Sequence, residues 1–219
     1  MEGEATIPLF PLEVVLMPSM PLPLHIFEDR YKSMIGECLE QKKEFGVVCQ
    51  EGGGMKKIGC TTRIAQILRR FDDGRLDIMT QGESRFVIQS IHEDKTYLQA
   101  RVSYFDDEPE EMTDETNRLI SDGIKLLEQF DIMTGTKRDY SLLSRLDQKT
   151  ISFVISYNDE FTLEQKQKFL EMTSTIQRIT ESVQFLERLV QKAKLVQEIK
   201  EIIGGNGNLR RDVTKRLNQ

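Results

Sequence analysis

The chain has 219 residues, a net charge of −6 at pH 7 and a pI of about 5.2. This length can bury a working core, in one large domain or two small ones, whereas the acidic balance argues against a nucleic-acid partner, because phosphate backbones are bound through many lysine and arginine contacts. No apolar run approaches the roughly 20 residues of a membrane span and Met1 lacks the basic flank of a signal peptide, so we expect a cytoplasmic protein without membrane contact.

Residues 7–31 contain five of the six prolines. Each proline ring removes an N–H group and disfavours helical geometry in the residue before it, so this segment cannot be a helix. Residues 13–17 are rich in β-branched side chains and predict a strand that ends at Pro18. We expect residues 17–24 to form a stiff loop that presents apolar side chains.

Helical spacing follows this segment and then gives way to strand patterns. Apolar residues at i, i+3, i+4, i+7 and i+8 predict a helix over 28–43, with Tyr31, Met34, Ile35, Cys38 and Leu39 on its buried face. Strands are predicted over 45–49, 59–68, 86–91 and 97–105, with further strand alternation at Leu76 and Ile78 and turn residues at 72–74. Glycines 52–54 lack the spacing of a phosphate-binding loop and indicate a flexible hairpin loop. Short strands at this spacing predict a curled sheet or pseudo-barrel.

Several motifs in this order resemble a known family. They are Pro8-Leu-Phe-Pro-Leu12, Leu22-Pro-Leu-His-Ile-Phe-Glu-Asp-Arg-Tyr31, Phe45-Gly-Val-Val48, Gly82-Glu-Ser-Arg-Phe86 and Leu163-Glu-Gln-Lys-Gln-Lys-Phe-Leu-Glu171. The chain is similar over about residues 7–203 to the Lon N-terminal domain, the substrate-recognition region of Lon-type ATP-dependent proteases. The resemblance implies a PUA-like pseudo-barrel. Ser19 stands where this family usually has glycine, so the turn there is expected to be altered.

Residues 106–115 mark the main boundary, because seven of these ten residues are acidic and one is proline. We expect a solvated linker that buries no apolar surface. Helical spacing then predicts helices over 113–132 and 141–157 and a third opened by the capping box Thr162–Gln165. Thr173-Ser174 opens the last helix, which would have about 28 residues up to residue 203 and a length of roughly 42 Å. Glycines 204, 205 and 207 are expected to end this helix.

The predicted fold class is therefore α+β. A PUA-like β pseudo-barrel with one helix spans 7–107, an α-helical bundle ending in a long helix spans 112–203, and residues 204–219 form a flexible basic tail. The long helix carries two apolar stripes. The first consists of Ile176, Ile179, Val183, Leu186, Val190 and Ala193, and the second of Phe185, Leu189, Leu195 and Ile202. Either both stripes pack inside the bundle, or one of them forms a coiled-coil contact with a second chain and makes a homodimer.

Catalytic residues are few. The only histidines are His25 and His92, and three cysteines, Cys38, Cys49 and Cys60, match neither a disulfide framework nor a zinc site, which predicts buried reduced thiols. The acidic run lacks the order of a calcium loop. Full-length Lon proteases continue into an ATPase module and a protease domain, but this chain has no Walker motif and no protease domain. The resemblance therefore also argues against catalysis. We expect a free-standing, non-enzymatic family member with no cofactor and no metal.

Recognition through apolar contact remains the favoured function. Methionine side chains form adaptable surfaces, and the resemblance implies that the proline-rich segment holds unfolded or extended polypeptides through Met17, Pro18, Met20, Pro21, Leu22, Leu24 and Phe27. Alternatively, these residues seal the barrel against the helices. The predicted role is substrate recognition or an adaptor function in protein quality control, with an ATP-dependent protease as a partner.

Two other functions stay open. The first is an RNA-binding PUA-like protein, because Arg69-Arg70 precede Phe71 and Arg85 precedes Phe86, and such pairs of basic and aromatic residues occur in nucleic-acid binders. The second is an enzyme with an unrecognised small-molecule pocket.

Overall fold

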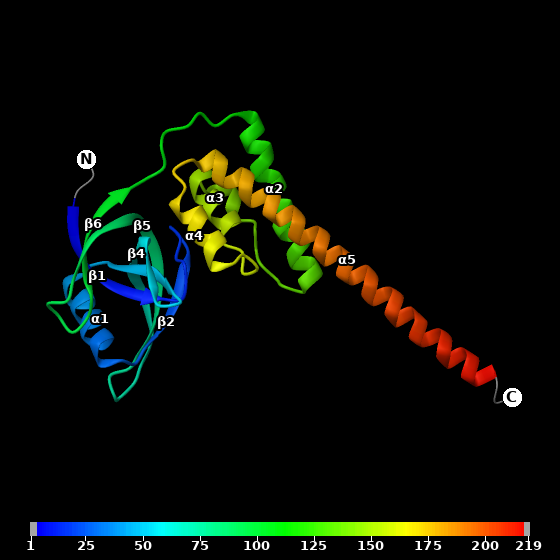
Figure 1. Cartoon of the computed structure of the whole chain (residues 1–219), viewed down its shortest axis with the longest axis horizontal. Helices are drawn as coiled ribbons and strands as arrows, with labels where there is room; N and C mark the ends of the chain where they lie inside the picture. Colours follow the sequence, from blue (N-terminus) through cyan, green and yellow to red (C-terminus); the bar gives the residue numbers. More distant parts are fainter. Residues whose placement is uncertain (1–3, 217–219) are drawn as a thin grey trace.

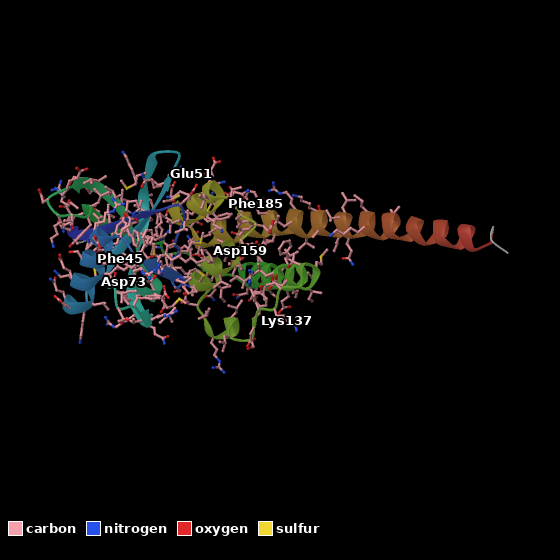
Figure 2. All side chains as sticks on the ribbon, turned by 90° about the horizontal axis from the view of Figure 1, so that it is seen from below. Phe45, Glu51, Asp73, Lys137, Asp159 and Phe185 are labelled. Atoms are coloured by element: carbon pink, nitrogen blue, oxygen red, sulfur yellow. The ribbon has the colours of Figure 1, made fainter. Side chains whose placement is uncertain are left out.

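The computed structural model describes residues 4–216, with the side chains at 144, 201 and 203–216 left aside. A β-barrel occupies one end of the molecule and a helical bundle packs beside it (Figure 1). The last helix extends away from the bundle as a single long rod (Figure 1 and Figure 2). No helix within the described range is long and apolar enough to cross a membrane.

Six strands form the barrel: β1 (Glu4–Leu12), β2 (Pro21–Ile26), β3 (Phe45–Glu51), β4 (Gly54–Arg70), β5 (Leu76–His92) and β6 (Gln99–Phe105). Their order in the sheet is β2-β5-β4-β3-β1-β6, and β6 also pairs with β5, so the sheet closes on itself. Only the β1–β3 pair is parallel among these strands. The predicted pseudo-barrel with one helix, α1 (Asp29–Gln41), is confirmed.

The predicted strand over 13–17 is wrong, because the strand lies earlier, at β1, and runs through Pro8 and Pro11. Residues 4–8 of β1 pair with β6, whereas residues 9–12 pair with β3. Each end of β1 thus has an unpaired side, on which a proline needs no donor. Residues 13–17 leave the sheet, and Val15, Leu16 and Met17 fill the core as a loop.

The predicted loop over 17–24 is also partly wrong, because residues 21–26 form β2, an edge strand that pairs with β5 alone. Proline is tolerated on an edge strand, since one side of the strand makes no ladder hydrogen bonds. Alternation along β2 exposes Pro21, Pro23 and His25 and buries Leu22 and Ile26.

A tight turn at 17–20 packs directly against β5. The Ser19 N–H donates to the Gly82 carbonyl oxygen at 2.8 Å, and the Gly82 N–H donates to the Met20 carbonyl oxygen at 2.9 Å. A Cβ on Gly82 would lie 2.2 Å from the Met17 carbonyl oxygen, so only glycine fits there. Ser19 has φ +65°, the left-handed conformation that glycine adopts without strain. The turn therefore exists although serine replaces the glycine usual in the family.

The remaining strand predictions need two adjustments. Gly52 and Gly53, with φ of +58° and +82°, form a tight two-residue hairpin turn instead of a flexible loop. The segments predicted around 76–78 and 86–91 belong to one long strand, β5, whose partner β4 shows three register shifts against it. Such bulges let long strands bend around a barrel.

The second half contains α2 (Asp114–Thr134), a short 3₁₀ turn η1 (Leu143–Arg145), α3 (Gln148–Ser156), α4 (Leu163–Glu171) and α5 (Thr175–Arg216). The capping box at Thr162 is confirmed. The predicted helix over 141–157 begins too early, because Asp147 caps α3: its Oδ1 accepts from the Thr150 N–H at 2.8 Å. Such a cap requires extended backbone at Asp147.

The expected end of the last helix at residue 203 is wrong, because α5 continues to Arg216. Glycine costs a helix only about 1 kcal/mol relative to alanine. It ends a helix where the backbone turns left-handed, as Gly135 does after α2 with φ +74°. Residues 217–219 of the predicted basic tail lie outside the described range, and its flexibility stays a prediction.

The acidic linker is not fully solvated as predicted. The Asp107 side chain is only 6% exposed and accepts hydrogen bonds from Arg85 of β5 and from Arg178 and Thr175 of α5. Glu110 accepts from the Ile176 N–H at 3.0 Å, at the start of α5. Arg85 and Arg178, which lie 22 and 71 residues from Asp107 along the chain, compensate the negative charge of Asp107. The linker therefore joins the barrel to the bundle.

Candidate polypeptide-binding surfaces

The seven residues predicted to bind polypeptide do not form one surface. Met17, Met20 and Leu22 are buried in the core, Pro18 and Leu24 are half-buried, and Pro21 and Phe27 are exposed. Pro21 and Phe27 lie at opposite ends of β2. Met17, Met20 and Leu22 thus contribute to the core of the barrel, and the members of the set with exposed side chains are Pro21 and Phe27.

Met20 and Pro21 border a cavity of about 310 Å³ between the barrel and the bundle. Its polar wall is already paired, because Arg138 donates to Asp159 Oδ2 at 2.8 Å and the Tyr140 hydroxyl donates to Asp131 Oδ2 at 2.8 Å. Burial, together with the Asp131 carboxylate, raises the pKa of Tyr140 to about 12. Apolar contacts are therefore what this cavity offers to a ligand.

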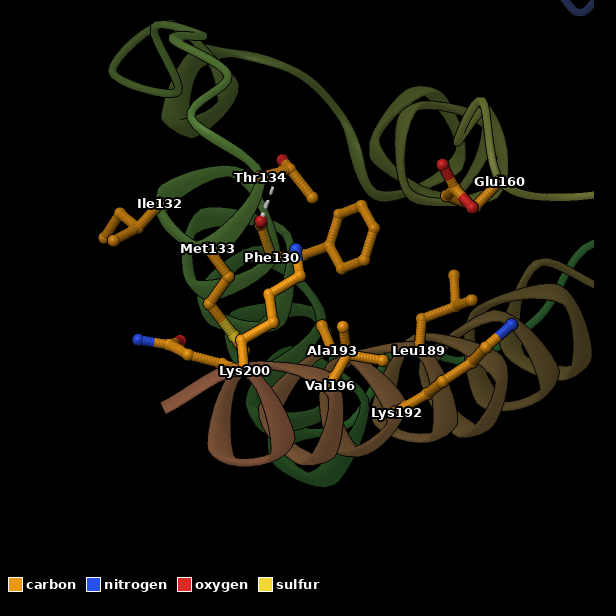
Figure 3. A pocket seen from close by; sticks show the side chains of 11 residues that line it. Phe130, Ile132, Met133, Thr134, Glu160, Leu189, Lys192, Ala193, Val196 and Lys200 are labelled. Carbon is orange, nitrogen blue, oxygen red and sulfur yellow. Dashed lines mark hydrogen bonds between the residues drawn. The ribbon is translucent and has the colours of Figure 1, made fainter. Parts of the chain in front are cut away.

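A more open groove lies between the C-terminal end of α2 and the middle of α5 (Figure 3). Its volume is about 590 Å³, and its apolar wall consists of Phe130, Ile132, Met133, Leu189, Ala193 and Val196. Because α2 ends at Thr134 while α5 continues, none of the described helices covers the face of α5 beyond that point. Ile132 is 79% exposed and Val196 is 43% exposed.

The rim of this groove is polar. Lys192 and Lys200 project from α5, and Glu160 faces the groove from the loop before α4 (Figure 3). An apolar floor with a charged rim suits extended polypeptide, whose apolar side chains can enter while its polar backbone stays near water. Sequence reasoning placed Leu189 and Ala193 on helical stripes but missed Ile132 and Met133, because nothing in a helix sequence shows where its packing partner ends.

The two stripes of the long helix behave differently. Ile179, Val183, Leu186 and Val190 of the first stripe are buried within the bundle. Leu195 and Ile202 of the second stripe are exposed, as is Ile199 between them. The sequence did not decide whether the second stripe packs inside the bundle or against a second chain. In the structure the C-terminal part of this stripe is accessible.

Histidines and cysteines occupy separate places. His25 Nδ1 lies 2.5 Å from Asp77 Oδ1, and His92 Nε2 lies 3.1 Å from Ser90 Oγ. All three thiols are free and buried. Burial raises the pKa of Cys38 to about 11 and also raises the pKa of Cys49 and Cys60, which holds all three as thiols at neutral pH. Among the described residues no group of His, Cys, Asp or Glu could hold a metal ion.

The two basic–aromatic pairs also differ. Arg85 is buried and bonds to the carbonyl oxygen of Leu170 at 3.0 Å, so it is closed to nucleic acid. Arg69 and Arg70 are exposed, and the Arg69 guanidinium lies 4.4 Å from the centre of the Phe71 ring. Of the signals for RNA binding, only the pair around Phe71 is accessible.

The fold defines a two-part α+β domain, a closed barrel with one helix joined to a helical bundle. Residues 6–188 match the family model of the ATP-dependent protease La (LON) substrate-binding domain, and the chain belongs to this family. This confirms the resemblance noted in the sequence.

Curated relatives and solved structures agree with this assignment. The chain is 24% identical over 210 residues to the Lon protease of Cytophaga hutchinsonii, which covers 90% of this chain and 26% of the relative. It is 27% identical over 163 residues to the Lon protease of Parabacteroides distasonis, covering 70% of this chain and 20% of the relative. The chain thus spans about a quarter of the length of these relatives.

Two solved structures share the fold. The Lon N-terminal domain protein from Xanthomonas campestris superposes with a TM-score of 0.65 at 21% identity, covering 81% of this chain and 96% of that one. The N-terminal domain of the Mycobacterium avium complex Lon protease has a TM-score of 0.65 at 19% identity, covering 85% and 98%.

Proposed function

We propose that this protein is a non-catalytic polypeptide-recognition module that holds unfolded or extended segments in the groove between α2 and α5. The observation that carries the proposal is the open apolar wall of this groove, with Ile132 and Val196 both accessible. Membership of a substrate-binding family supports it. Met133 adds an adaptable side chain, which suits a site that accepts varied apolar residues.

The ligand of the groove would be an unfolded polypeptide. This protein would then pass the polypeptide on to an ATP-dependent protease. The bound area need only be modest, because capture before transfer calls for weak and reversible binding. The accessible members of the predicted segment, Pro21 and Phe27, lie on the barrel and are not part of this groove.

Fluorescence anisotropy with labelled, reduced and carboxamidomethylated lysozyme tests this function. Ile132→Asp and Val196→Asp change exposed side chains, so both variants should keep the fold. Ile91→Asp on β5 is the matched control, because Ile91 and Val196 are both 43% exposed. Substitutions at Met20 or Leu22 are unsuitable, because both side chains are buried and aspartate there would unfold the barrel.

We expect saturable binding that weakens about tenfold or more in each groove variant, since burial of one such side chain contributes about 1.5–3 kcal/mol. The control should bind like the unmodified protein. Absence of binding by the unmodified protein, or an equal loss in Ile91→Asp, would contradict the proposal.

We also infer that two copies associate through the exposed stripe of α5. Leu195, Ile199 and Ile202 follow one another at spacings of four and three, which is the repeat of a coiled-coil seam. All three side chains are accessible. This stripe and the groove use different residues of α5, so the two contacts can be tested separately.

A further inference from the structure

The cavity bordered by Met20 and Pro21 takes its walls from both halves of the protein. Met20 and Pro21 belong to the barrel, whereas Leu127 lies on α2, Val154 lies on α3 and Tyr157 directly follows α3. We call this space the junction cavity. Segments that are far apart in the sequence thus meet around a volume of about 310 Å³.

The junction cavity is apolar at its floor and polar at its mouth. Leu127 and Met20 are only 2% and 8% exposed. Pro21, Arg138 and Asp159 line the same cavity and are exposed, so they mark its opening. An apolar ligand that passes the mouth would therefore leave water and gain contacts with the buried floor.

The charges around the mouth compensate one another. Arg138 donates to Asp159 Oδ2 at 2.8 Å and lies 3.5 Å from Asp131 Oδ1. The Lys166 ammonium lies 5.4 Å from the centre of the Tyr157 ring and is attracted by Asp159. Among the described residues, two cations thus accompany two carboxylates here. A charged ligand would lose its hydration without meeting a free partner, so the cavity favours a neutral molecule.

The polar groups of the junction cavity are poorly suited to catalysis. The Tyr140 hydroxyl donates to Asp131 Oδ2 at 2.8 Å, and its pKa is raised to about 12, so it keeps its proton at neutral pH. Arg138 and Asp159 are engaged with each other. These contacts indicate a binding site, and not the active site of an enzyme.

Two wall residues favour an aromatic ligand. The thioether of Met20 can contact the edge of a ring, and the Tyr157 ring can pack edge-on or offset against a second ring. An apolar cavity of about 150 Å³ holds one benzene molecule. A volume of about 310 Å³ therefore suits a molecule of two fused rings.

We propose that the junction cavity binds a compact neutral molecule of two fused aromatic rings, which holds the barrel against the bundle. The rings pack between Met20 on one side and Val154 and Tyr157 on the other. A free molecule suits the mouth better than a side chain of a polypeptide, because a peptide backbone would displace water from the Arg138–Asp159 pair. The junction cavity and the α2–α5 groove share no lining residue, so this inference goes beyond polypeptide binding and does not depend on it.

Indole is the probe, because the chain contains no tryptophan and the indole fluorescence then comes from the ligand alone. Its anisotropy is measured as the protein is added. Indole-3-acetate and tryptamine carry a negative and a positive charge on the same rings. N-acetyltryptophanamide presents these rings on a peptide-like backbone.

Three variants locate the bound probe. Val154→Phe fills the cavity from α3, and Met20→Leu nearly keeps the side-chain volume but removes the sulfur. Ile132→Asp alters only the groove. Circular dichroism checks the fold of each variant, and should Val154→Phe not fold, Met20→Leu and the charged analogues still decide the outcome.

We expect saturable binding of indole with a Kd of about 0.1–1 mM. Binding should weaken about tenfold or more in Val154→Phe, because the space is filled, and about threefold in Met20→Leu. Each charged analogue should bind about tenfold more weakly than indole, and Ile132→Asp should bind indole like the unmodified protein. Indole should raise the urea midpoint of the unmodified protein but not that of Val154→Phe, since a ligand of the folded state stabilises it.

Several results would overturn the proposal. Saturable binding could be absent, or equal in Val154→Phe, which would place the probe elsewhere. A loss confined to Ile132→Asp would assign indole to the groove. Tighter binding of a charged analogue would contradict the charge balance, and tighter binding of N-acetyltryptophanamide would identify a polypeptide side chain as the occupant. The lysozyme titration reports the groove separately, so the two proposals can fail independently.

Discussion

Asp107→Asn should destabilise this protein more than any other neutralisation of a carboxylate in the linker. Asp107 accepts hydrogen bonds from Arg85 on the barrel and from Arg178 and Thr175 on α5. Both guanidinium groups are almost fully buried, and both lie over the Phe153 ring. Asparagine keeps the shape of the side chain but removes the only buried negative charge that these two cations share among the described residues.

The size of the effect follows from this burial. Removing one partner of a buried ion pair typically costs about 3–5 kcal/mol, because the other charge remains desolvated and unpaired. Asparagine keeps one acceptor oxygen, but its NH₂ group takes the place of the second oxygen and faces hydrogen-bond donors of Arg85, Arg178 or Thr175. We therefore expect a loss of about 3–5 kcal/mol, which is a large part of the about 5–15 kcal/mol that stabilises a typical domain.

Urea unfolding with linear extrapolation measures this loss. Asp106→Asn is the matched control, because the Asp106 side chain is 66% exposed and pairs with Lys149 at 2.6 Å. An exposed pair contributes about 0–1 kcal/mol, so this variant should stay close to the unmodified protein. A loss below about 1 kcal/mol in Asp107→Asn would refute the role of Asp107 in joining the two halves.

The pH dependence has a defined sign. Burial raises the pKa of Asp107, but the hydrogen bonds from Arg178 and Thr175 and the charges of both arginines outweigh burial, so the net pKa is lowered. A lowered pKa in the folded state contributes stability above the pKa of the unfolded chain, about 3.9, and this stability is lost as pH falls below it. The difference between the unmodified protein and Asp107→Asn should therefore shrink below about pH 4.

Two further predictions concern the turn and the long helix. Ser19→Gly should raise the free energy of unfolding by about 0.5–1 kcal/mol, because glycine removes the left-handed strain at φ +65° at some cost in chain entropy. Ser19→Ala should give no such gain. A lower free energy of unfolding for Ser19→Gly, measured with urea, would show that the turn is not strained. Leu195→Lys combined with Ile199→Lys should halve the mass seen by light scattering if α5 pairs two copies, whereas Ile132→Lys should not; a monomeric unmodified protein at high concentration would contradict the dimer.

Local patterns in the sequence determined much of the fold. Helical spacing located α1 with Tyr31, Met34, Ile35 and Cys38 buried, and the capping box at Thr162 located the start of α4. The acidic run at 106–115 separated the strands from the helices. These features depend on side chains a few residues apart, and for that reason they can be read along the chain. The family could be recognised because its motifs recur in one order.

The candidate surfaces depended on contacts between distant segments. Pairing with β5 made residues 21–26 a strand, and its alternation decided that Leu22 is buried while Pro21 and Phe27 are exposed. The end of α2 decided which face of α5 stays uncovered. Asp107 looked like a solvated linker residue until Arg85 and Arg178 were brought to it. A sequence specifies which side chains are apolar or charged, but exposure and pairing are set by what packs against them, and only the tertiary structure decides that.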